Sequence, residues 1–268
     1  MFDKLNDFQN RAPGAVAVLT IPTNRTVDKI HLRLPAGVTK DKITRIEGKI
    51  NDRRFFEDTG ANVTIRDNYL SGNGSFVDPQ VITLDFTEPG ARGGAPEQYL
   101  TSLPANLMKS LKFEITIDPS VSVANAGAII AECDYRGPTT NPFVMRRQSM
   151  TQALSFIGEN DLILPNGQAG GLIKRMWIHH TGHIKAAEIR ADNSTKNRWT
   201  DLESMAYGQK RHGYVPQANL HVLDFVQDGN LMAAYNTRAY TENLLRLTTD
   251  AADQARIYVD FIDHIKAI

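Results

Sequence analysis

The sequence contains a single cysteine, Cys133, so no disulfide bond can form within the chain. Cys133 lies in the apolar run from Ala128 to Tyr135, which predicts a small buried residue and not a nucleophile. The polar start, Met1 to Phe8, argues against a secretory signal, and we expect synthesis in a reducing cytoplasm. No stretch approaches the roughly 18 apolar residues that a membrane-spanning helix needs.

The chain also lacks an excess of charge of either sign. It has 30 lysines and arginines against 30 aspartates and glutamates, so its formal net charge is zero. Proteins that hold DNA through its phosphates usually carry a surplus of lysine and arginine, which argues against direct nucleic-acid binding. The 268 residues, 41% of them apolar, suffice for one large folded domain or for two smaller ones.

Short motifs of known chemistry are missing as well. The glycine-rich segments 72–74, 90–94 and 167–171 have neither the phosphate-loop nor the dinucleotide-binding spacing, so they are predicted to be turns. The sequence has no Gly-x-Ser-x-Gly elbow and no EF-hand spacing of carboxylates. We therefore expect a protein that is not an enzyme, without catalytic residues and without a cofactor.

What the sequence does contain is a weak internal repeat. The segment Ile43–Ile50 is matched about 141 residues later by Ile184–Ala191. Three further pairs follow in the same order: Leu84–Phe86 with Leu223–Phe225, Glu114–Asp118 with Arg246–Asp250, and the extended run Ala128–Tyr135 with Arg256–Ile262. Because the order is kept and the offsets shrink slowly, the pattern predicts two copies of one all-β unit.

Each half contains about eight short candidate strands separated by glycine and proline turns, with one or two helices in the long connections. This pattern favours a sandwich or barrel in each half. We predict an all-β fold of two eight-stranded jelly-roll barrels in tandem, a double jelly roll with short helices in the connections. Ile43–Phe55 is predicted as one longer strand, Asn62–Leu70 as a short helix or irregular link, and Asp201–Arg211 as the clearest helix, with Thr200 as its N-cap.

The best linker lies at mid-chain. Residues 138–142 hold two prolines and small polar residues, which can continue neither a strand ladder nor a helix. We therefore predict a first jelly roll over residues 13–137 and a second over residues 143–268. Residues 1–12, which are mostly polar, are predicted to form an N-terminal arm.

One histidine cluster stands out. His179, His180 and His183, with Glu188 beyond them, could supply ligands for zinc, iron or manganese. A metal-binding protein or enzyme of the bicupin type, using His180, His183 and Glu188, is therefore an alternative function. Because neighbouring residues of a strand point to opposite faces, His179 and His180 cannot both enter one metal shell. Histidines exposed at a strand end and turn are the simpler interpretation.

A third function is a carbohydrate-binding double β-sandwich. Such a protein would carry exposed aromatic residues on one face of a sheet. The sequence holds 8 tyrosines and 2 tryptophans.

The second half resembles a known family. The segments that carry the resemblance are Phe143–Arg147, Leu162–Pro165, Ile173–His179, Ala187–Asp192, Lys196–Leu202, Leu223–Phe225, Leu244–Leu247 and Ala255–Phe261. They are similar to the major capsid protein of the corticoviruses, which are tailless icosahedral bacterial viruses with an internal membrane. The similarity extends over about residues 143–262, whereas mainly the order of strands matches in residues 1–140.

The resemblance implies a double jelly roll that forms homotrimers with a near-hexagonal outline. Such trimers tile the icosahedral capsid of the virion around the viral membrane. The expected partners are neighbouring capsid trimers, minor capsid, spike and membrane proteins, and the membrane beneath the shell. Direct contact with nucleic acid is not expected, because lipid lies between. The resemblance also admits bound calcium, but it assigns no ligands and offers no catalytic residues.

A trimer of such subunits needs an extensive and partly apolar interface. The candidate interface residues are Arg146, Arg147, Trp199 and Tyr214. The two arginines would form ion pairs with a neighbouring copy or lie on the outer face of a strand. The two aromatic residues would supply apolar contacts or belong to the core.

Overall fold

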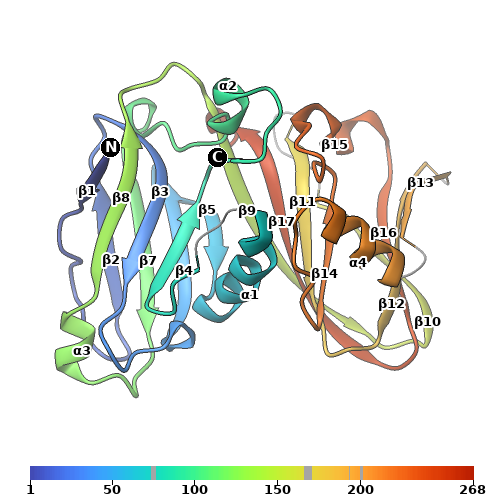
Figure 1. The fold of residues 1–268 in the computed structure, drawn as a ribbon, viewed down its shortest axis with the longest axis horizontal. Helices are drawn as coiled ribbons and strands as arrows, with labels where there is room; N and C mark the ends of the chain where they lie inside the picture. The colour runs from blue at the N-terminus through green and yellow to red at the C-terminus, as the bar shows by residue number, and fades with distance from the viewer. Residues whose placement is uncertain (74–76, 166–170, 193, 200–201) are drawn as a thin grey trace.

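The computed structural model describes residues 1–73, 77–165, 171–192, 194–199 and 202–268. The chain forms two β-barrels that stand side by side (Figure 1). Within the described residues every strand pairing joins strands of the same half, and neighbouring strands run antiparallel. The predicted fold class, two jelly rolls in tandem, is confirmed.

The first barrel consists of two four-stranded sheets with the orders β1-β8-β3-β6 and β2-β7-β4-β5. Its strands are β1 Phe2–Lys4, β2 Val16–Ile21, β3 Thr26–Arg33, β4 Ile43–Ile50, β5 Arg53–Asp58, β6 Val81–Asp85, β7 Leu111–Ile117 and β8 Ile130–Arg136. Its helices are α1 Gly60–Leu70, α2 Ala95–Gln98 and α3 Val123–Gly127, with 3-10 turns at Lys40–Lys42, Ser71–Asn73 and Ala105–Leu107.

The second barrel repeats this order with sheets β14-β11-β17-β9 and β10-β16-β12-β13, and the short strand β15 adds to β11. Its strands are β9 Phe143–Leu154, β10 Gly158–Ile163, β11 Leu172–His179, β12 Ile184–Ala191, β13 Ser194–Trp199, β14 Leu220–Asp224, β15 Tyr235–Asn236, β16 Asn243–Thr249 and β17 Asp253–His264. Its helix is α4 Leu202–Arg211, with 3-10 turns at Leu231–Ala233, Thr237–Ala239 and Ile265–Ala267.

The repeat extends to the register of the strands. Bulges are built into a fold at defined places, and three of them recur at matching positions in both barrels. In each matching pair, the first bulge belongs to the first barrel and the second bulge to the second barrel. The pairs are Val27/Lys29 with Ile173/Arg175, Ile43/Arg45 with Ile184/Ala186, and Gly48/Lys49 with Ile189/Arg190. The matched segments of the sequence therefore occupy equivalent strands, and around these bulges the two halves correspond residue by residue.

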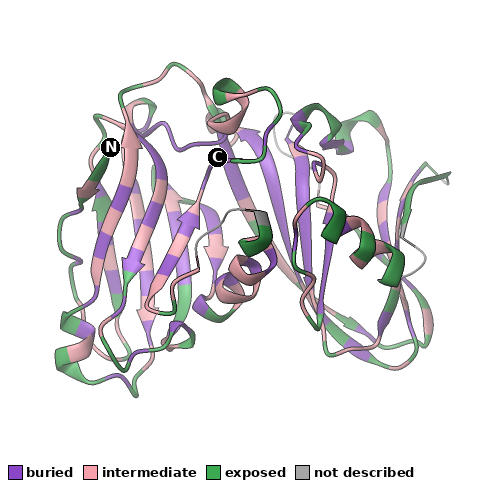
Figure 2. Ribbon diagram, in the orientation of Figure 1, coloured by how far each residue is buried: buried purple, intermediate pink, exposed green. Residues whose placement is uncertain are grey.

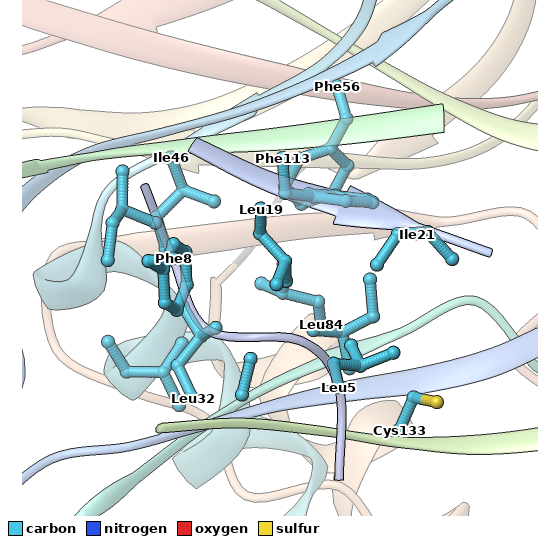
Figure 3. Packing of buried hydrophobic residues seen from close by; sticks show 14 of the residues in the cluster. Leu5, Phe8, Leu19, Ile21, Leu32, Ile46, Phe56, Leu84, Phe113 and Cys133 are labelled. Carbon is cyan, nitrogen blue, oxygen red and sulfur yellow. The ribbon is translucent and has the colours of Figure 1, made fainter. Parts of the chain in front are cut away.

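Four phenylalanine rings form the centre of the first barrel's core. The rings of Phe55, Phe56, Phe86 and Phe113 lie 5.8 to 6.4 Å apart, centroid to centroid, in every pairing. Figure 3 shows Phe56 and Phe113 on one side of this core, with Phe8 and aliphatic side chains such as Leu19 and Leu84 beyond them. A Cβ at position 48 would lie 2.7 Å from the Phe55 ring, so Gly48 is what allows that ring to enter the core.

The N-terminal segment, predicted as an arm over residues 1–12, is instead built into the first barrel. Strand β1 pairs antiparallel with β8 and supplies the first of the eight strands. Leu5 and Phe8 are 4% and 5% exposed and join the core (Figure 3). Burying these two apolar side chains stabilises the barrel by a few kcal/mol, which a free arm would forgo.

The single long strand predicted over Ile43–Phe55 is wrong. The chain reverses at Asn51 and Asp52, which adopt φ values of 50° and 66°. Asparagine and aspartate tolerate this left-handed region, and two consecutive residues with positive φ are typical of a tight hairpin turn. Asn51 Oδ1 also accepts a hydrogen bond of 2.8 Å from the Lys109 N–H, which fixes the turn against the segment that leads into β7.

Helix α1 lies where a helix or irregular link was predicted, and Thr59 is its N-cap. The Thr59 hydroxyl accepts a hydrogen bond of 3.2 Å from the Asn62 N–H. Helix α4 confirms the clearest predicted helix, but its predicted cap, Thr200, lies outside the described residues. Among the helices that the structure describes, none is both long enough and apolar enough to cross a membrane.

Replacing Thr59 by alanine is expected to lower the free energy of unfolding by about 1 kcal/mol, because one N–H of the first helical turn loses its partner. Chemical denaturation of the purified protein measures this change. Thr59→Ser keeps the hydroxyl and should retain most of the stability. Equal losses in both variants would show that the hydrogen bond is not the cause.

Candidate functional site at the junction between the barrels

The two barrels meet along a junction formed mainly by β5 and α1 of the first barrel and by β9, β11 and β17 of the second. Helix α1 lies between the barrels (Figure 1), and the strands beside it are largely buried (Figure 2). Six consecutive residues of β11, Ile173 to Ile178, are buried. Alternate residues point to opposite faces of a strand, so one face of β11 covers the second core and the other face covers the first barrel.

Aromatic rings fill the centre of the junction. Tyr69 of α1 stacks on Tyr214 with ring centroids 5.0 Å apart, and it meets Trp177 of β11 edge-on at 5.5 Å. Tyr258 of β17 is fully buried, and its hydroxyl accepts a hydrogen bond of 2.6 Å from Asn62 Nδ2 of α1. Burial raises the pKa of Tyr69, Tyr214 and Tyr258, so these phenols stay neutral. The cluster holds α1 against the second barrel.

A chain of buried charges crosses the same junction. Asp58, the last residue of β5, accepts hydrogen bonds from Arg66 of α1 and, at 2.6 Å, from Arg147 Nη1 of β9. Arg147 also donates to both oxygens of Asp260, at 2.6 and 2.9 Å, and Trp177 Nε1 donates to Asp260 at 2.7 Å. Burial alone would raise the pKa of Asp260, but Arg147 and the indole N–H outweigh it and lower this pKa to about 2. Arg147 therefore joins a carboxylate of each barrel.

A second buried network lies beside the first. Arg175 donates to Glu88 at 2.7 and 2.8 Å and to Asp224 at 2.6 Å, and Lys174 Nζ lies 2.9 Å from Glu88 Oε2. Glu88 belongs to the first half of the chain, and the two cations belong to the second. Burial would raise the pKa of Glu88, but Arg175 and Lys174 lower it to about 2. The junction is thus held by two sets of desolvated ion pairs that cross from one barrel to the other.

Three of the four predicted subunit contacts are contacts within the chain. Arg147 and Tyr214 lie in the junction, and Arg146 donates a hydrogen bond of 2.8 Å to Asp263. The side chains of Arg146 and Arg147 are at most 10% exposed, because each guanidinium has a buried carboxylate partner. They are therefore not available to a neighbouring copy. Trp199 ends strand β13, and its side chain is outside the described part of the structure.

The predicted metal ligands are not brought together. The His180 ring stacks on His221 with centroids 4.3 Å apart, whereas His183 Nδ1 lies 3.0 Å from Asp250. The Glu188 carboxylate accepts a hydrogen bond from a threonine and forms ion pairs with two arginines of its own sheet. Over the described residues there is no group of three or more His, Cys, Asp or Glu side chains arranged to hold a metal ion.

His179 and His180 point away from each other, as the strand geometry predicts. His179 Nε2 lies 3.3 Å from Arg66 Nη1 in the junction, while His180 faces His221. Burial and the positive charge of Arg66 lower the pKa of His179 to about 3. Burial and His221 lower the pKa of His180 to about 4. Both imidazoles are therefore neutral at pH 7.

Most charged residues of the junction were missed by the sequence reasoning. Asp58, Glu88, Arg175 and Asp260 were not predicted as a site, because their partners are far away in the chain. One signal was available for Arg175 and Asp260, which stand inside runs of apolar residues, where a charge needs a buried partner. No signal of this kind marks Asp58 or Glu88.

Two family models match the chain. The model of the viral coat protein P2 N-terminal domain matches residues 2–133, and that of the viral coat protein P2 C-terminal domain matches residues 144–265. Together they span most of the sequence, one on each barrel. No curated protein sequence matches the chain.

Solved structures share the fold. The major capsid protein P2 from Bacteriophage PM2 is similar with a TM-score of 0.88 and 18% identity, over 98% of this chain and 97% of that one. The STIV MCP, from Sulfolobus Turreted Icosahedral Virus, has a TM-score of 0.70 and 10% identity, over 97% and 96%. The PBCV-1 virus capsid has a TM-score of 0.64 and 10% identity, over 99% and 94%. At these identities the likeness shows a shared fold.

Proposed function

The chain belongs to the viral coat protein P2 family and is a structural protein of a viral capsid, and we propose that it forms homotrimers that tile an icosahedral shell around an internal viral membrane. The observation that carries this proposal is the match of one coat-protein domain to each barrel. Three chains with two equivalent barrels each give a ring of six similar units, which suits a near-hexagonal tile.

The rigidity of the junction supports this function. A tile must keep a fixed angle between its two barrels so that its edges meet those of its neighbours. The buried ion pairs of Arg147 and Arg175 and the stacked rings of Tyr69 and Tyr214 fix α1 against the second barrel in one arrangement. Desolvated polar networks of this kind specify geometry even where they add little stability.

We further propose that the protein has no catalytic activity and needs no cofactor for its fold. Its place is the capsid of the virion, after synthesis in the host cytoplasm. Its partners are neighbouring capsid trimers, minor capsid, spike and membrane proteins, and the membrane beneath the shell, without direct contact to nucleic acid. Calcium ions are a further candidate ligand, and they would have to bind at loop carboxylates.

Light scattering of the purified protein tests the homotrimer. We expect a mass three times that of the 29.8 kDa chain, and electron micrographs of the same sample should show particles with a near-hexagonal outline. A stable monomer at micromolar concentration would contradict the proposal. Metal analysis of the same sample tests the bicupin alternative, which requires a stoichiometric transition metal.

A further inference from the structure

The first barrel's side of the junction has an equivalent on the second barrel. Strand β13 corresponds to β5, and helix α4 corresponds to α1, because each follows the same strand in the same order of strands. The shared bulges fix which residue of one barrel corresponds to which residue of the other. The difference in residue number between Ile43 and Ile184 is the same as that between Arg66 of α1 and Tyr207 of α4, so these two helix residues are equivalent. The two barrels thus carry the same docking element.

The two helices differ in what covers them. In α1, Arg66 and Tyr69 are buried under the second barrel. In α4, Tyr207 is 67% exposed, and Lys210 and Arg211 are exposed as well. Figure 2 shows the ribbon of α4 mainly in the colours of exposed and intermediate residues. The helix has the position of a docking element, but the described part of the chain supplies nothing that covers Tyr207 or Lys210.

The receiving side of the junction also has an equivalent, the outer face of strands β1, β3 and β8. The bulges at Val27/Lys29 and Ile173/Arg175 align the two sheets. The aligned pairs are Lys29 with Arg175, His31 with Trp177, Arg33 with His179, Glu132 with Tyr258, and Asp134 with Asp260. Both sheets keep one ion pair in this alignment, Lys29 with Asp85 at 2.8 Å and Arg175 with Asp224 at 2.6 Å.

The two receiving faces differ in exposure as the helices do. Trp177 and Tyr258 are 2% and 0% exposed beneath α1. On the first barrel the side chains of their counterparts, His31 and Glu132, are 19% and 14% exposed. Towards the edge of this face Arg33, Asp134 and Phe2 are 54%, 40% and 60% exposed. Over the part of the chain that the structure describes, one molecule therefore has an uncovered docking element on the second barrel and a partly exposed receiving face on the first.

We propose that α4 and β13 of one copy dock on the outer face of β1, β3 and β8 of the next copy, and so repeat between chains the junction that α1 and β5 form within the chain. This inference rests on the proposed homotrimer and specifies its interface. The contact joins two different surfaces, so it is heterologous, and such contacts close into a ring when the rotation between copies is a whole fraction of a turn. A ring of three copies leaves neither surface uncovered.

The contacts of the junction within the chain identify the equivalent contacts between two copies. Arg66 Nη1 lies 3.3 Å from His179 Nε2. The equivalent pair is Tyr207 of one copy with Arg33 of the next. Arg33 is held in place by a hydrogen bond of 2.9 Å to Glu132. A phenol ring stacked on a guanidinium is a favourable cation–π contact, so Tyr207 has a suitable partner at its equivalent position.

The strand part of the junction changes its chemistry. Within the chain, Asp58 of β5 meets Arg147 of β9. The equivalent positions are residue 199 on β13 and Phe2 on β1. The buried ion pair has no equivalent there, because neither residue is charged, and Phe2 would lose its exposure to water on docking. This substitution suits a contact that forms after the chain has folded.

One equivalent pair is unfavourable. Within the chain, Ser149 donates a hydrogen bond of 2.9 Å to Glu57. At the equivalent positions between copies, Lys4 would lie opposite Arg198. Each cation has an acidic neighbour, Asp7 at 3.9 Å from Lys4 and Glu188 at 3.5 Å from Arg198. The contact between copies is therefore weaker than the junction within a chain, and trimers should dissociate before the two barrels separate.

Cysteine crosslinking tests the interface. The double variant Arg33→Cys/Tyr207→Cys replaces two exposed side chains, so folding is preserved. The native Cys133 is buried and should not react. With a short bis-maleimide, the variant should give a covalent trimer as the main product on a denaturing gel. The single variants should give none, because a heterologous contact does not bring a residue against its own copy.

The matched control is Val123→Cys/Tyr207→Cys, in which the second thiol lies on α3 at a residue that is 73% exposed. It should give at least ten times less crosslinked product. If light scattering shows a trimer but the Arg33/Tyr207 variant crosslinks no better than this control, the inferred interface is wrong and the homotrimer stands. If the protein is a monomer, the homotrimer and its interface both fail.

Discussion

Replacing Arg147 by alanine is expected to lower the free energy of unfolding by about 3–5 kcal/mol. Arg147 is the cation shared by Asp58 and Asp260, both of them at most 2% exposed. Without it, two carboxylates remain buried with less compensation for their lost hydration. The loss should appear in a denaturant titration followed by tryptophan fluorescence, since Trp177 donates a hydrogen bond to Asp260.

The control for this experiment is Arg33→Ala. Arg33 also pairs with a carboxylate, that of Glu132, at 2.9 Å, but its side chain is 54% exposed. Exposed pairs contribute about 0–1 kcal/mol, so this variant should be nearly as stable as the parent. A double variant, Arg147→Met/Asp260→Asn, removes one buried ion pair and leaves Asp58 paired with Arg66, so it should lose less stability than Arg147→Ala alone. Equal losses for Arg147→Ala and Arg33→Ala would disprove the buried-charge explanation.

Acid is expected to destabilise the protein from about pH 6.5 downward. The folded-state pKa of His179 is about 3 and that of His180 about 4, both below the usual value near 6.5. As the pH falls through 6.5, the unfolded chain takes up protons that the folded chain does not. Each such proton lowers the free energy of unfolding by about 1.4 kcal/mol per pH unit. The pKa of His221 is lowered as well and acts in the same direction.

The carboxylates extend and partly oppose this effect. Glu88 and Asp260 have folded-state pKa values of about 2, so the stability they contribute is lost between about pH 5 and pH 2. Asp67 has the opposite effect on the free energy of unfolding. Burial raises its pKa to about 6, so as the pH falls it binds a proton at a higher pH in the folded state than in the unfolded state. Burial raises the pKa of Asp224 as well, so it acts in the same direction as Asp67, but the three histidines outnumber these two carboxyls between pH 6 and pH 4.5.

Denaturant titrations at a series of pH values measure this dependence. In His180→Gln the free energy of unfolding should change less steeply between pH 6.5 and pH 4.5, because one of the groups that take up a proton on unfolding is removed. His183→Gln is the matched control, since it removes an imidazole whose side chain is 44% exposed. A free energy of unfolding that is flat or rises as the pH falls from 6.5 to 4.5 would contradict the expected sign.

The barrels themselves could be predicted because local patterns determine them. Leu111–Ile117 alternates buried and half-buried residues, as its apolar periodicity required. The repeat that links Ile43 with Ile184 was also visible, because equivalent strands keep similar residues and the same bulges. The hairpin at Asn51 and Asp52 was missed, since two residues in the left-handed region leave a weak trace in the sequence.

The N-terminal segment shows a different limit. Residues 1–12 are mostly polar and were predicted as an arm. Their pairing with β8 depends on a strand more than a hundred residues away, and the burial of Leu5 and Phe8 depends on the core that this strand completes. Short polar segments of this kind gain their structure from tertiary partners and not from local propensity.

The amino-acid sequence by itself determined the two-barrel fold and the absence of a recognisable catalytic motif, because strand periodicity, turns and the internal repeat are properties of neighbouring residues. Only the tertiary structure decided how the barrels are joined. Arg147 meets Asp58 across 89 positions of the chain, and Arg175 meets Glu88 across 87. Whether such charges are solvated or buried in pairs is determined by long-range packing, and no local pattern records it.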